Sequence, residues 1–420
     1  MTTVSEVVVV GAGMAGAFAV QALREEGFSG RIVLVGAEPH RPYERPPLSK
    51  GYLQGSTERE KVFVHPAGWY DEHDVELRTS VEVTGLDREG QQVVLGDGSR
   101  LSYDQLVVAT GAEPRRLDVP GADLDGVLLL RSLENSDAIR ATFAGVSAAA
   151  SGAGVGRVAI VGGGWIGLET AAAARMAGLE VTVLEQDDLP LLRVLGPELA
   201  KVFADLHRDK GVDLRGGVAV AELTGSLGRV TGVRLRDGTE VAADAVLVGV
   251  GVRPRTELAE AAGLEVRGGV VVDEHLRSSD PRILAAGDVA FAFSRPLGRH
   301  VRVEHWANAR RQGAVAARSL LGRDAWDPRP PYFFTDQYDL GMEYNGYVGS
   351  EGYERVVIRG DLASREFIAF WVAGGRVLAG MNVNVWDVAD QIERLVLSGA
   401  QVDPMRLADP DVPLEELVAG

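Results

Sequence analysis

Two apolar runs in this chain each lead into glycines spaced Gly-x-Gly-x-x-Gly. They occupy residues 6–16 and 157–167, and their glycines are Gly11, Gly13 and Gly16 in the first run and Gly162, Gly164 and Gly167 in the second. In such a turn the first glycine makes a tight bend, the second lets a phosphate approach the backbone, and the third lets a helix pack closely on the strand. The spacing therefore predicts two strand–turn–helix units whose helix N-termini bind the pyrophosphate of a dinucleotide.

The residues after each turn continue the same pattern. Small, helix-compatible residues fill 17–25 and 168–177, and the apolar runs 31–35 and 180–184 then predict a second strand in each unit. One such motif is weak, because glycines at turns are common. Two motifs in the same strand–turn–helix–strand order indicate two related dinucleotide-binding domains.

A second repeated feature is an Asp-Gly pair between apolar residues, which is a strong hairpin signal. Asp97-Gly98 precedes the apolar run 101–108, and Asp237-Gly238 precedes the run 241–248, which ends at Gly249. We therefore expect an α/β chain with two Rossmann-like domains, each carrying a small inserted sheet.

Composition changes mark the ends of these domains. The Ala/Gly/Ser-rich stretch 144–156 predicts a surface connection. The proline-rich segment 326–331 interrupts regular structure, and beyond it 355–358 and 367–372 predict strands and 388–397 predicts a helix. These features indicate a separate C-terminal α+β domain at 322–420.

Composition also excludes several kinds of site. The 420 residues contain no cysteine, so a disulfide, a thiolate-bound metal or a redox-active dithiol is impossible, and the scattered histidines indicate no metal site. The formal net charge of -17 disfavours nucleic acid and anionic membrane, and its simplest explanation is that acidity keeps the protein soluble. With no secretory signal and no membrane-spanning run, we expect a cytoplasmic protein.

An acidic residue after the second strand of such a unit usually binds the adenosine ribose. Glu185 follows the run 180–184, and Gln186, Asp187 and Asp188 come next with no Arg or Lys. A 2′-phosphate would meet repulsion there, so the second domain is expected to prefer NADH over NADPH. In the first domain Glu38 lies close to the equivalent place, but Ala37 leaves the assignment open.

Four segments then establish a resemblance to a known family. They are Arg-Pro-Tyr-Glu-Arg-Pro-Pro-Leu-Ser-Lys at 41–50, the turn and helix start at 162–169, Gly-Asp at 287–288, and Asp-Gln-Tyr-Asp at 336–339. Over nearly its whole length the chain resembles the FAD-dependent ferredoxin reductases of bacterial oxygenase systems, the putidaredoxin reductase and rhodocoxin reductase type. The resemblance implies a glutathione-reductase-like architecture with FAD in the first domain, 1–112 and 246–321. It places the substrate NADH in the second domain, 113–245, and the C-terminal domain over the flavin.

The resemblance also implies the residues that contact each cofactor. Those carried over for FAD, beside the first glycine turn and Glu38, are Ala15, Lys50, Val83, Arg131, Asp288 and Trp306. For NADH, the candidates are the second turn and Glu185, predicted above from the residue pattern, together with Gly249. Lys50 and Glu169 are the candidate catalytic pair: Lys50 would place positive charge beside the flavin and stabilise its reduced, anionic form.

Each of these side chains also has a structural explanation. Lys50 could be a solvated surface lysine, Asp288 an N-cap for a following helix, and Trp306 a core residue. Glu169, expected in the first turn of its helix, could favour the helix dipole or pair with Lys50 across the domain interface.

The implied reaction passes a hydride from NADH to FAD and then single electrons to a [2Fe–2S] ferredoxin that feeds an oxygenase such as a cytochrome monooxygenase. Because such ferredoxins are usually acidic, a local basic patch is needed, and the candidates are Arg295, Arg299, Arg302, Arg310 and Arg311. A solvated face explains these arginines equally well. The alternative function is a flavin- and NADH-sensing interaction protein resembling apoptosis-inducing factors. A monomer or weak homodimer is expected.

Overall fold

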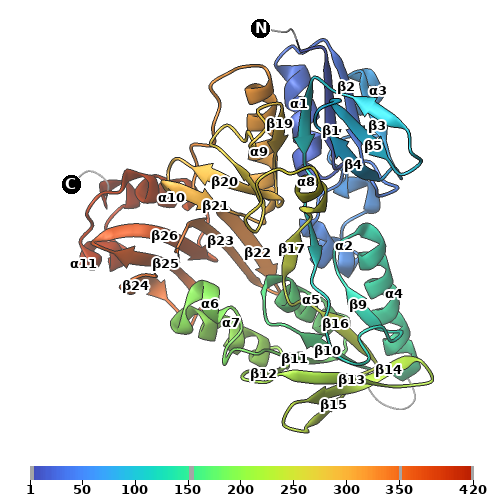
Figure 1. Ribbon diagram of the computed structural model, residues 1–420. Coiled ribbons are helices and arrows are strands. Elements are labelled where there is room, and N and C mark those ends of the chain that lie inside the picture. Colours follow the sequence, from blue (N-terminus) through green and yellow to red (C-terminus); the bar gives the residue numbers. More distant parts are fainter. Residues whose placement is uncertain (1–3, 151–155, 350–351, 418–420) are drawn as a thin grey trace. The chain divides into compact units, whose positions relative to one another are not determined.

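The computed structural model describes residues 4–150, 156–349 and 352–417 (Figure 1). It divides into two compact units, each assembled from separate stretches of chain. The first contains Met1–Glu44, Glu60–Glu113 and Arg253–Phe333, and the second contains Arg45–Arg59, Pro114–Val252 and Phe334–Gly420.

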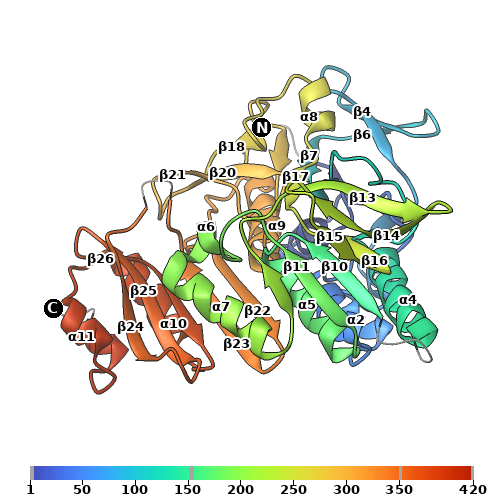
Figure 2. The ribbon, with the colours of Figure 1, turned by 90° about the horizontal axis from the view of Figure 1, so that it is seen from below.

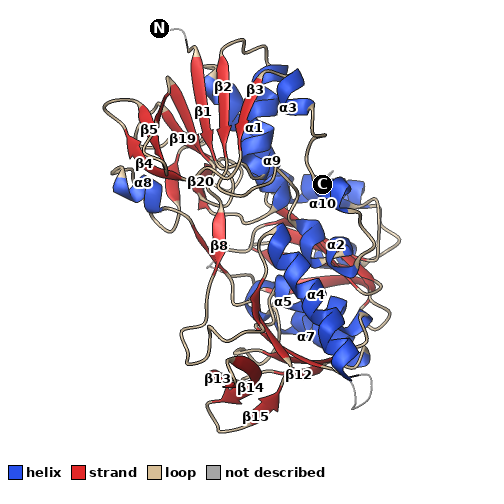
Figure 3. Ribbon diagram, turned by 90° about the vertical axis from the view of Figure 1, so that its right-hand side faces the viewer, coloured by secondary structure: helices blue, strands red, loops and turns tan. Residues whose placement is uncertain are grey.

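The first unit is built on a parallel sheet in the order β3-β2-β1-β7-β19. Its strands are β1 (Glu6–Val10), β2 (Arg31–Val35), β3 (Val75–Arg78), β7 (Gln105–Val108) and β19 (Ile283–Ala285). All four valines of β1 are buried, as expected for a strand covered on both faces. Helices α1 (Met14–Glu25) and α9 (Trp306–Leu320) lie side by side against this sheet (Figure 3).

Smaller elements complete the first unit. They are the sheet β4 (Val83–Asp87), β5 (Gln92–Leu95) and β6 (Arg100–Ser102), the sheet β18 (Val270–Val272), β20 (Ala290–Ser294) and β21 (Arg299–Val301), and the short helices η2 (Arg59–Val62), α3 (Trp69–Glu72) and α8 (Glu257–Ala261). Strands β8 (Ala112–Pro114) and β17 (Val252–Pro254) form a further two-stranded sheet.

The second unit repeats the parallel sheet in the order β12-β11-β10-β16-β9. Its strands are β9 (Val127–Leu129), β10 (Arg157–Val161), β11 (Glu180–Leu184), β12 (Asp213–Arg215) and β16 (Ala245–Val248). The helices of this part are η1 (Pro46–Ser49), α2 (Gly51–Gln54), α4 (Leu133–Ala150), α5 (Trp165–Met176), α6 (Leu192–Leu195) and α7 (Pro197–Asp209). The small sheet β13 (Val220–Ser226), β14 (Arg229–Leu235) and β15 (Glu240–Ala242) shares a hydrophobic cluster with β10 and β16.

The C-terminal part of the second unit is a five-stranded sheet in the order β22-β23-β26-β25-β24 (Figure 2). Its strands are β22 (Tyr332–Gln337), β23 (Leu340–Gly346), β24 (Arg355–Asp361), β25 (Glu366–Ala373) and β26 (Arg376–Val383). Helices α10 (Ala389–Ser398), α11 (Pro404–Ala408) and η3 (Leu414–Leu417) contribute with the sheet to a separate hydrophobic core. These three sheets confirm the predicted fold class of two Rossmann-like parts and a C-terminal α+β part.

The structure corrects several expected boundaries. Helices α1 and α5 begin three residues earlier than expected, because Gly13 and Gly164 are their N-caps. The run 101–108 is divided between β6 and β7, and 241–248 between β15 and β16, each on either side of a turn. The predicted surface connection at 144–156 is wrong up to Ala150, where α4 continues with the help of alanine, the best helix former. Residues 151–155 lie outside the described residues.

Two kinds of feature are absent from the described residues. No helix in that part of the chain is both long and apolar enough to cross a bilayer. In the same ranges, no three His, Asp or Glu side chains are grouped as a metal site would require.

Helices α1 and α9 approach closely through Gly313, which the sequence analysis did not single out. A Cβ at this position would lie 2.4 Å from Ala15 O and 2.9 Å from Ala19 N, both backbone atoms of α1. We expect Gly313→Ala to lower the free energy of unfolding by about 1–3 kcal/mol, because the helices would have to separate.

The matched control is Gly145→Ala in the exposed part of α4, where a Cβ would meet no atom within 4 Å. This change should raise stability by roughly 0.5–1 kcal/mol, the helix preference of alanine over glycine. Urea unfolding of both variants measures the difference. Equal effects of the two substitutions would contradict the proposed close contact.

Candidate functional site

The first and third glycines of both turns are required by contacts within the protein. A Cβ on Gly11 would lie 2.1 Å from Ala109 O, and one on Gly162 would lie 2.4 Å from Gly249 O. Both glycines also have φ values, +115° and +107°, that favour glycine. A Cβ on Gly16 or Gly167 would lie 2.1 or 2.0 Å from the carbonyl oxygen of the first glycine. These contacts hold each helix start against the ends of two strands.

The middle glycine of each turn, unlike the first and third, faces open space. A Cβ on Gly13 or Gly164 would meet no protein atom within 4 Å. Each is the N-cap of its helix, neither helix has a side-chain cap, and neither has an acidic residue in its first turn. The protein therefore leaves open space and helix N–H groups at the place where a pyrophosphate would bind. Both turns fit a dinucleotide.

The second turn also positions an acidic side chain. Glu185 follows β11 directly, and its carboxylate accepts hydrogen bonds from Gly163 N at 2.5 Å and Asp187 N at 2.9 Å. The side chain can lie against the turn because Gly163 has no Cβ; a Cβ there would be 3.0 Å from Glu185 Oε2. The carboxylate is thus fixed beside the turn, at the position expected of a ribose ligand.

The first turn does not reproduce this arrangement. In the paired strands Val10 lies opposite Val35, as Val161 lies opposite Leu184, so Gly36 takes the place of Glu185. A side chain at Gly36 is excluded, because its Cβ would lie 2.5 Å from Ala12 Cβ. The first acidic residue after β2 is Glu38, whose carboxylate accepts a hydrogen bond from the Tyr43 hydroxyl. The ribose assignment to Ala37 or Glu38 stays a prediction.

The sequence analysis missed a cation, Arg193, that lies beside Asp187. Arg193, on α6, has Nε 2.7 Å from Asp187 Oδ2, and its guanidinium is exposed. The absence of Arg and Lys holds for the residues that directly follow Glu185, but α6 brings Arg193 back to Asp187. Because Arg193 pairs with Asp187, its guanidinium offers less positive charge to a 2′-phosphate.

Two other residues carried over for FAD, Ala15 and Asp288, lie on segments that meet at the first turn. Ala15 stands in the first turn of α1, and a Cβ on Gly287 would lie 3.0 Å from Ala15 Cβ. Gln312 of α9 accepts a hydrogen bond from Gly287 N at 2.8 Å, which fixes the turn that carries Asp288. The suggestion that Asp288 caps a helix is wrong, because this turn leads into strand β20. Val83 begins β4 at the edge of the small sheet.

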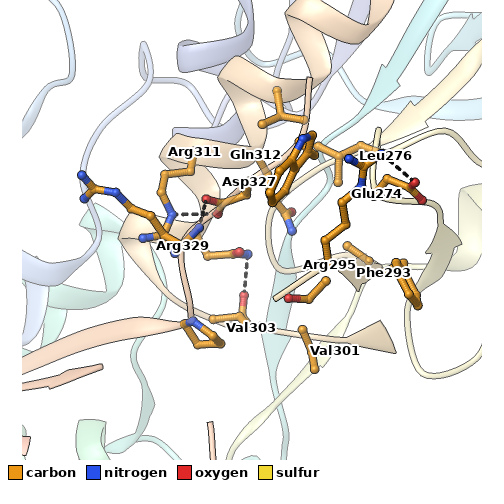
Figure 4. Close-up of a pocket in the computed structure, with 16 residues that line it drawn as sticks. Glu274, Leu276, Phe293, Arg295, Val301, Val303, Arg311, Gln312, Asp327 and Arg329 are labelled. Carbon is orange, nitrogen blue, oxygen red and sulfur yellow. Dashed lines mark hydrogen bonds and ion pairs between the residues drawn. The ribbon is translucent and has the colours of Figure 1, made fainter. Parts of the chain in front are cut away.

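A pocket in the first unit is lined by residues around the start of α9 (Figure 4). The Arg311 guanidinium reaches Asp327, with Nε 2.8 Å from Oδ2, and Arg295 pairs with Glu274 at 3.1 Å. Arg302 pairs with Glu304. Three of the five arginines suggested as a basic patch are thus engaged by acids of this chain. Arg310 instead stacks over Phe18 and Trp306, at 5.2 and 5.8 Å from the ring centres.

The second unit holds the candidate catalytic pair. Lys50 Nζ lies 2.7 Å from Glu169 Oε1, so the predicted pairing is confirmed. Both residues belong to the same compact unit, because 45–59 joins it through contacts of α2 with α4 and α5. Glu169 is the fifth residue of α5, beyond the first turn in which it was expected, and its side chain is only 3% exposed.

Two further side chains, both missed by the sequence analysis, complete the surroundings of this carboxylate. Ser49 Oγ donates to Glu169 Oε2 at 2.5 Å, and Thr335 Oγ1 donates to Oε1 at 2.5 Å. Lys50 Nζ also lies 5.2 Å from the centre of the Phe334 ring. Lys50 thus neutralises the buried carboxylate, and the hydroxyls of Ser49 and Thr335 help to orient it.

The loop that carries Lys50 is fixed by its own sequence and by α4. Pro46 and Pro47 begin the 3-10 helix η1, where their restricted φ angles favour a helical start. Ser136 of α4 donates to Leu48 O at 2.8 Å. Arg131 also contacts this loop: its carbonyl accepts a hydrogen bond from Arg45, and its N–H donates to Asn135 at 3.1 Å.

Comparison with known proteins identifies the family. The profile of the pyridine nucleotide-disulphide oxidoreductases matches residues 5–313, and that of the reductase C-terminal domain matches residues 332–418. The chain belongs to the pyridine nucleotide-disulphide oxidoreductase family. It has no cysteine, so it lacks the dithiol that a disulphide reductase of this family would use.

Full-length relatives narrow the comparison further. Putidaredoxin reductase CamA of Pseudomonas putida is 38% identical, with 100% of this chain and 98% of the relative covered. Rhodocoxin reductase of Rhodococcus erythropolis is 38% identical, covering 98% of this chain and 94% of the relative. The solved covalent complex of putidaredoxin reductase with putidaredoxin superposes with a TM-score of 0.93 at 38% identity, covering 99% of this chain and 98% of that chain. The predicted resemblance is confirmed.

The open middle glycines provide a paired test of the two nucleotide sites. Gly13→Ala should weaken flavin retention by at least about tenfold, because its methyl group enters the space left for a pyrophosphate. Gly164→Ala should leave the flavin bound and raise the KM for NADH by a similar factor. Each variant is the control for the other, measured by flavin absorbance after gel filtration and by NADH titration.

Neither methyl group meets protein atoms, so both variants should unfold near the wild-type temperature once saturated with their nucleotide. Flavin loss from Gly164→Ala and not from Gly13→Ala would reverse the assignment of the two sites.

Arg193 suggests how nucleotide preference can be changed without introducing a new cation. In the double variant Glu185→Ser, Asp187→Ser the guanidinium loses its carboxylate partner and can meet a 2′-phosphate. We expect the ratio of kcat/KM for NADPH to that for NADH to rise at least about tenfold, the value of one charge-assisted hydrogen bond. Adding Arg193→Ala should remove the gain. An unchanged ratio in the double variant would show that the ribose lies elsewhere.

Proposed function

We propose that this chain is an FAD-dependent NADH:ferredoxin reductase that delivers single electrons to a [2Fe–2S] ferredoxin of an oxygenase system. The observation that carries the proposal is a pair of open dinucleotide turns in a cysteine-free chain. That chain is similar over its whole length to putidaredoxin reductase. Electrons from NADH cannot pass to a protein dithiol, so a separate carrier would have to receive them.

Each proposed nucleotide site uses the residues of one turn. FAD would be held by the first turn, with Ala15 at its pyrophosphate, Asp288 at its ribityl chain, and Glu38, Val83 and Trp306 as further contacts. NADH would be held by Gly162, Gly164 and Gly167 with Glu185 and Gly249. The proposed FAD domain is 1–112 with 246–321, the proposed NADH domain is 113–245, and the proposed C-terminal domain is 322–420.

When bound, FAD supplies the redox chemistry: it accepts a hydride and releases electrons one at a time. The residues of this chain would orient the bound flavin and stabilise its reduced form. Lys50 supplies a positive charge, and Glu169 holds its ammonium group in one place at 2.7 Å. Arg131 is proposed as a further FAD contact from the same unit. None of these residues needs to form a covalent bond during turnover.

The proposed partner is a soluble acidic ferredoxin in the cytoplasm, met by a monomer or weak homodimer. Among the arginines suggested for docking, those held by Glu274, Glu304 and Asp327 contribute less net positive charge. Arg310 is exposed and stacks on aromatic rings, which makes it the strongest single candidate for a docking contact.

An anaerobic reduction assay tests the function. Purified protein should be yellow, NADH should bleach the flavin absorbance, and addition of [2Fe–2S] ferredoxins from a panel should restore it within turnover times. The flux to at least one ferredoxin, measured anaerobically, should exceed by about tenfold or more the flux to oxygen, measured separately in air without ferredoxin. NADH reduction followed by slow reoxidation with every ferredoxin would favour a sensing protein instead.

A further inference from the structure

The Asp336-Gln337-Tyr338-Asp339 segment has no part in the proposed cofactor contacts, yet two of its side chains belong to a continuous polar chain inside the second unit. The chain begins at the buried carboxylate of Glu169, which Thr335 Oγ1 contacts at 2.5 Å. Gln337 Nε2 lies 3.2 Å from Thr335 Oγ1, and Gln337 Oε1 lies 2.8 Å from His207 Nε2. The Tyr338 hydroxyl forms the outermost and longest link, 3.4 Å from His207 Nδ1.

The direction of every hydrogen bond in this chain follows from its inner end. An ionised carboxylate can only accept, so Thr335 donates its hydroxyl proton to Glu169 and must accept from the Gln337 amide NH₂. The Gln337 carbonyl oxygen then faces His207, whose Nε2 must carry the proton. His207 Nδ1 is left as the acceptor for Tyr338. All four donors therefore point towards Glu169.

The surroundings of the chain favour this single arrangement. Thr335 and Gln337 are 1% exposed and His207 is 0% exposed, so water cannot replace the protein donors. Burial lowers the pKa of His207 to about 4, which keeps the ring neutral near pH 7 and leaves one ring nitrogen as an acceptor. Thr335 and Gln337 alternate with the exposed Asp336 on β22, so both side chains point inward from one face of the strand.

Tyr338, at the outer end of this hydrogen-bonded series, has an unusual backbone conformation. Tyr338 has a φ of +57°, a conformation that bulky residues rarely adopt. Its ring lies 5.5 Å from Lys210 Nζ, and Lys210 pairs with Asp339 at 2.9 Å. These contacts join the turn after β22 to the end of α7, two elements that lie side by side in Figure 2.

We propose that Thr335, Gln337 and His207 are positioning residues that hold Glu169 as a carboxylate in the orientation that grips Lys50. Aligned hydrogen bonds in a buried chain strengthen one another, so each donor adds to the stabilisation of the negative charge. The C-terminal sheet thereby acts on the Lys50 ammonium group through the Glu169 carboxylate, which both Thr335 and Lys50 contact. The effect on turnover rests on the proposed function; the effect on Glu169 does not.

Other charges near this carboxylate have to be considered in any pH experiment. Lys50 faces it from the loop between η1 and α2, and Asp336 faces Lys50 from β22. Glu343 of β23 acts on Asp336 in turn, and Arg175 and Lys210 stand near Tyr338 at the outer end. None of these groups is altered by the variants below.

The test compares Thr335→Val, which keeps the shape and removes the donor, with Thr335→Ser, which keeps the hydroxyl. The first readout is the pKa of the Glu169 carboxyl, followed by ¹³C NMR in the full-length, flavin-loaded protein with labelled glutamate and assigned with Glu169→Gln. Thr335→Val should raise this pKa by roughly one to two units, the value of a hydrogen bond to a charged group, and Thr335→Ser should restore it. Gln337→Met should give a smaller rise in the same direction.

Thr170→Val is the matched control. Thr170 is also fully buried and follows Glu169 on α5, but its hydroxyl donates to backbone oxygens of the same helix and not to the carboxylate. It should leave the Glu169 pKa unchanged. A Glu169 pKa that does not move in Thr335→Val, or that moves equally in Thr170→Val, would overturn the proposal.

The second readout is the rate of flavin reduction by NADH. Thr335→Val should slow reduction about tenfold with little change in the Kd for NADH, and the acid limb of its pH profile should move upward with the Glu169 pKa. Wild-type protein that NADH does not reduce would refute the proposed function, while the NMR result would still decide whether the chain holds the carboxylate. A changed pKa without a changed rate would limit the chain to a structural role and refute its role in positioning Lys50.

Discussion

The close approach of backbone to backbone at the two glycine turns is the constraint on which the other features depend. Gly11 lies against the Ala109 carbonyl and Gly162 against that of Gly249, at separations that no other residue allows. Each contact fixes a helix N-terminus above the carboxyl ends of parallel strands, where N–H groups and the helix dipole favour an anion. A similar close approach occurs at Gly313. Because this residue has no Cβ, α9 can lie close to α1, and Gln312 reaches the turn that carries Asp288.

The two turns share this backbone but differ in one reciprocal exchange of side chains. Where the second turn has Gly163 and Glu185, the first has Ala12 and Gly36, and the Cβ of Ala12 fills the space that the carboxylate would need. A glutamate that directly follows the strand is therefore possible only in the second unit. The exchange gives the two turns different side-chain surroundings, while their sheets and helices remain in the same order.

The sequence predicted the features that local patterns determine, and it failed where contacts join distant segments. Both turns, the Asp-Gly hairpins and the C-terminal α+β part could be predicted because glycine spacing and alternation of apolar residues are local properties. The position of Glu38 could not, since it depends on the register of β1 with β2. Arg193 was missed because α6 brings it back to Asp187, and the helix at 144–150 was missed because small residues permit both a linker and a helix. Ser49 and Thr335 lie 120 and 166 residues from Glu169, so no local pattern could reveal them.

The burial of Glu169 shows how these distant contacts depend on one another. A carboxylate that is 3% exposed loses several kcal/mol of hydration, which one lysine alone would offset poorly. Ser49 and Thr335 provide the remaining hydrogen bonds, and both are themselves almost completely buried. Since a carboxylate can only accept, each neighbour must donate, and this requirement passes outward through Gln337 to the protonated nitrogen of His207. One charge therefore determines the hydrogen-bonding state of side chains on β22 and α7 that lie well beyond its own contacts.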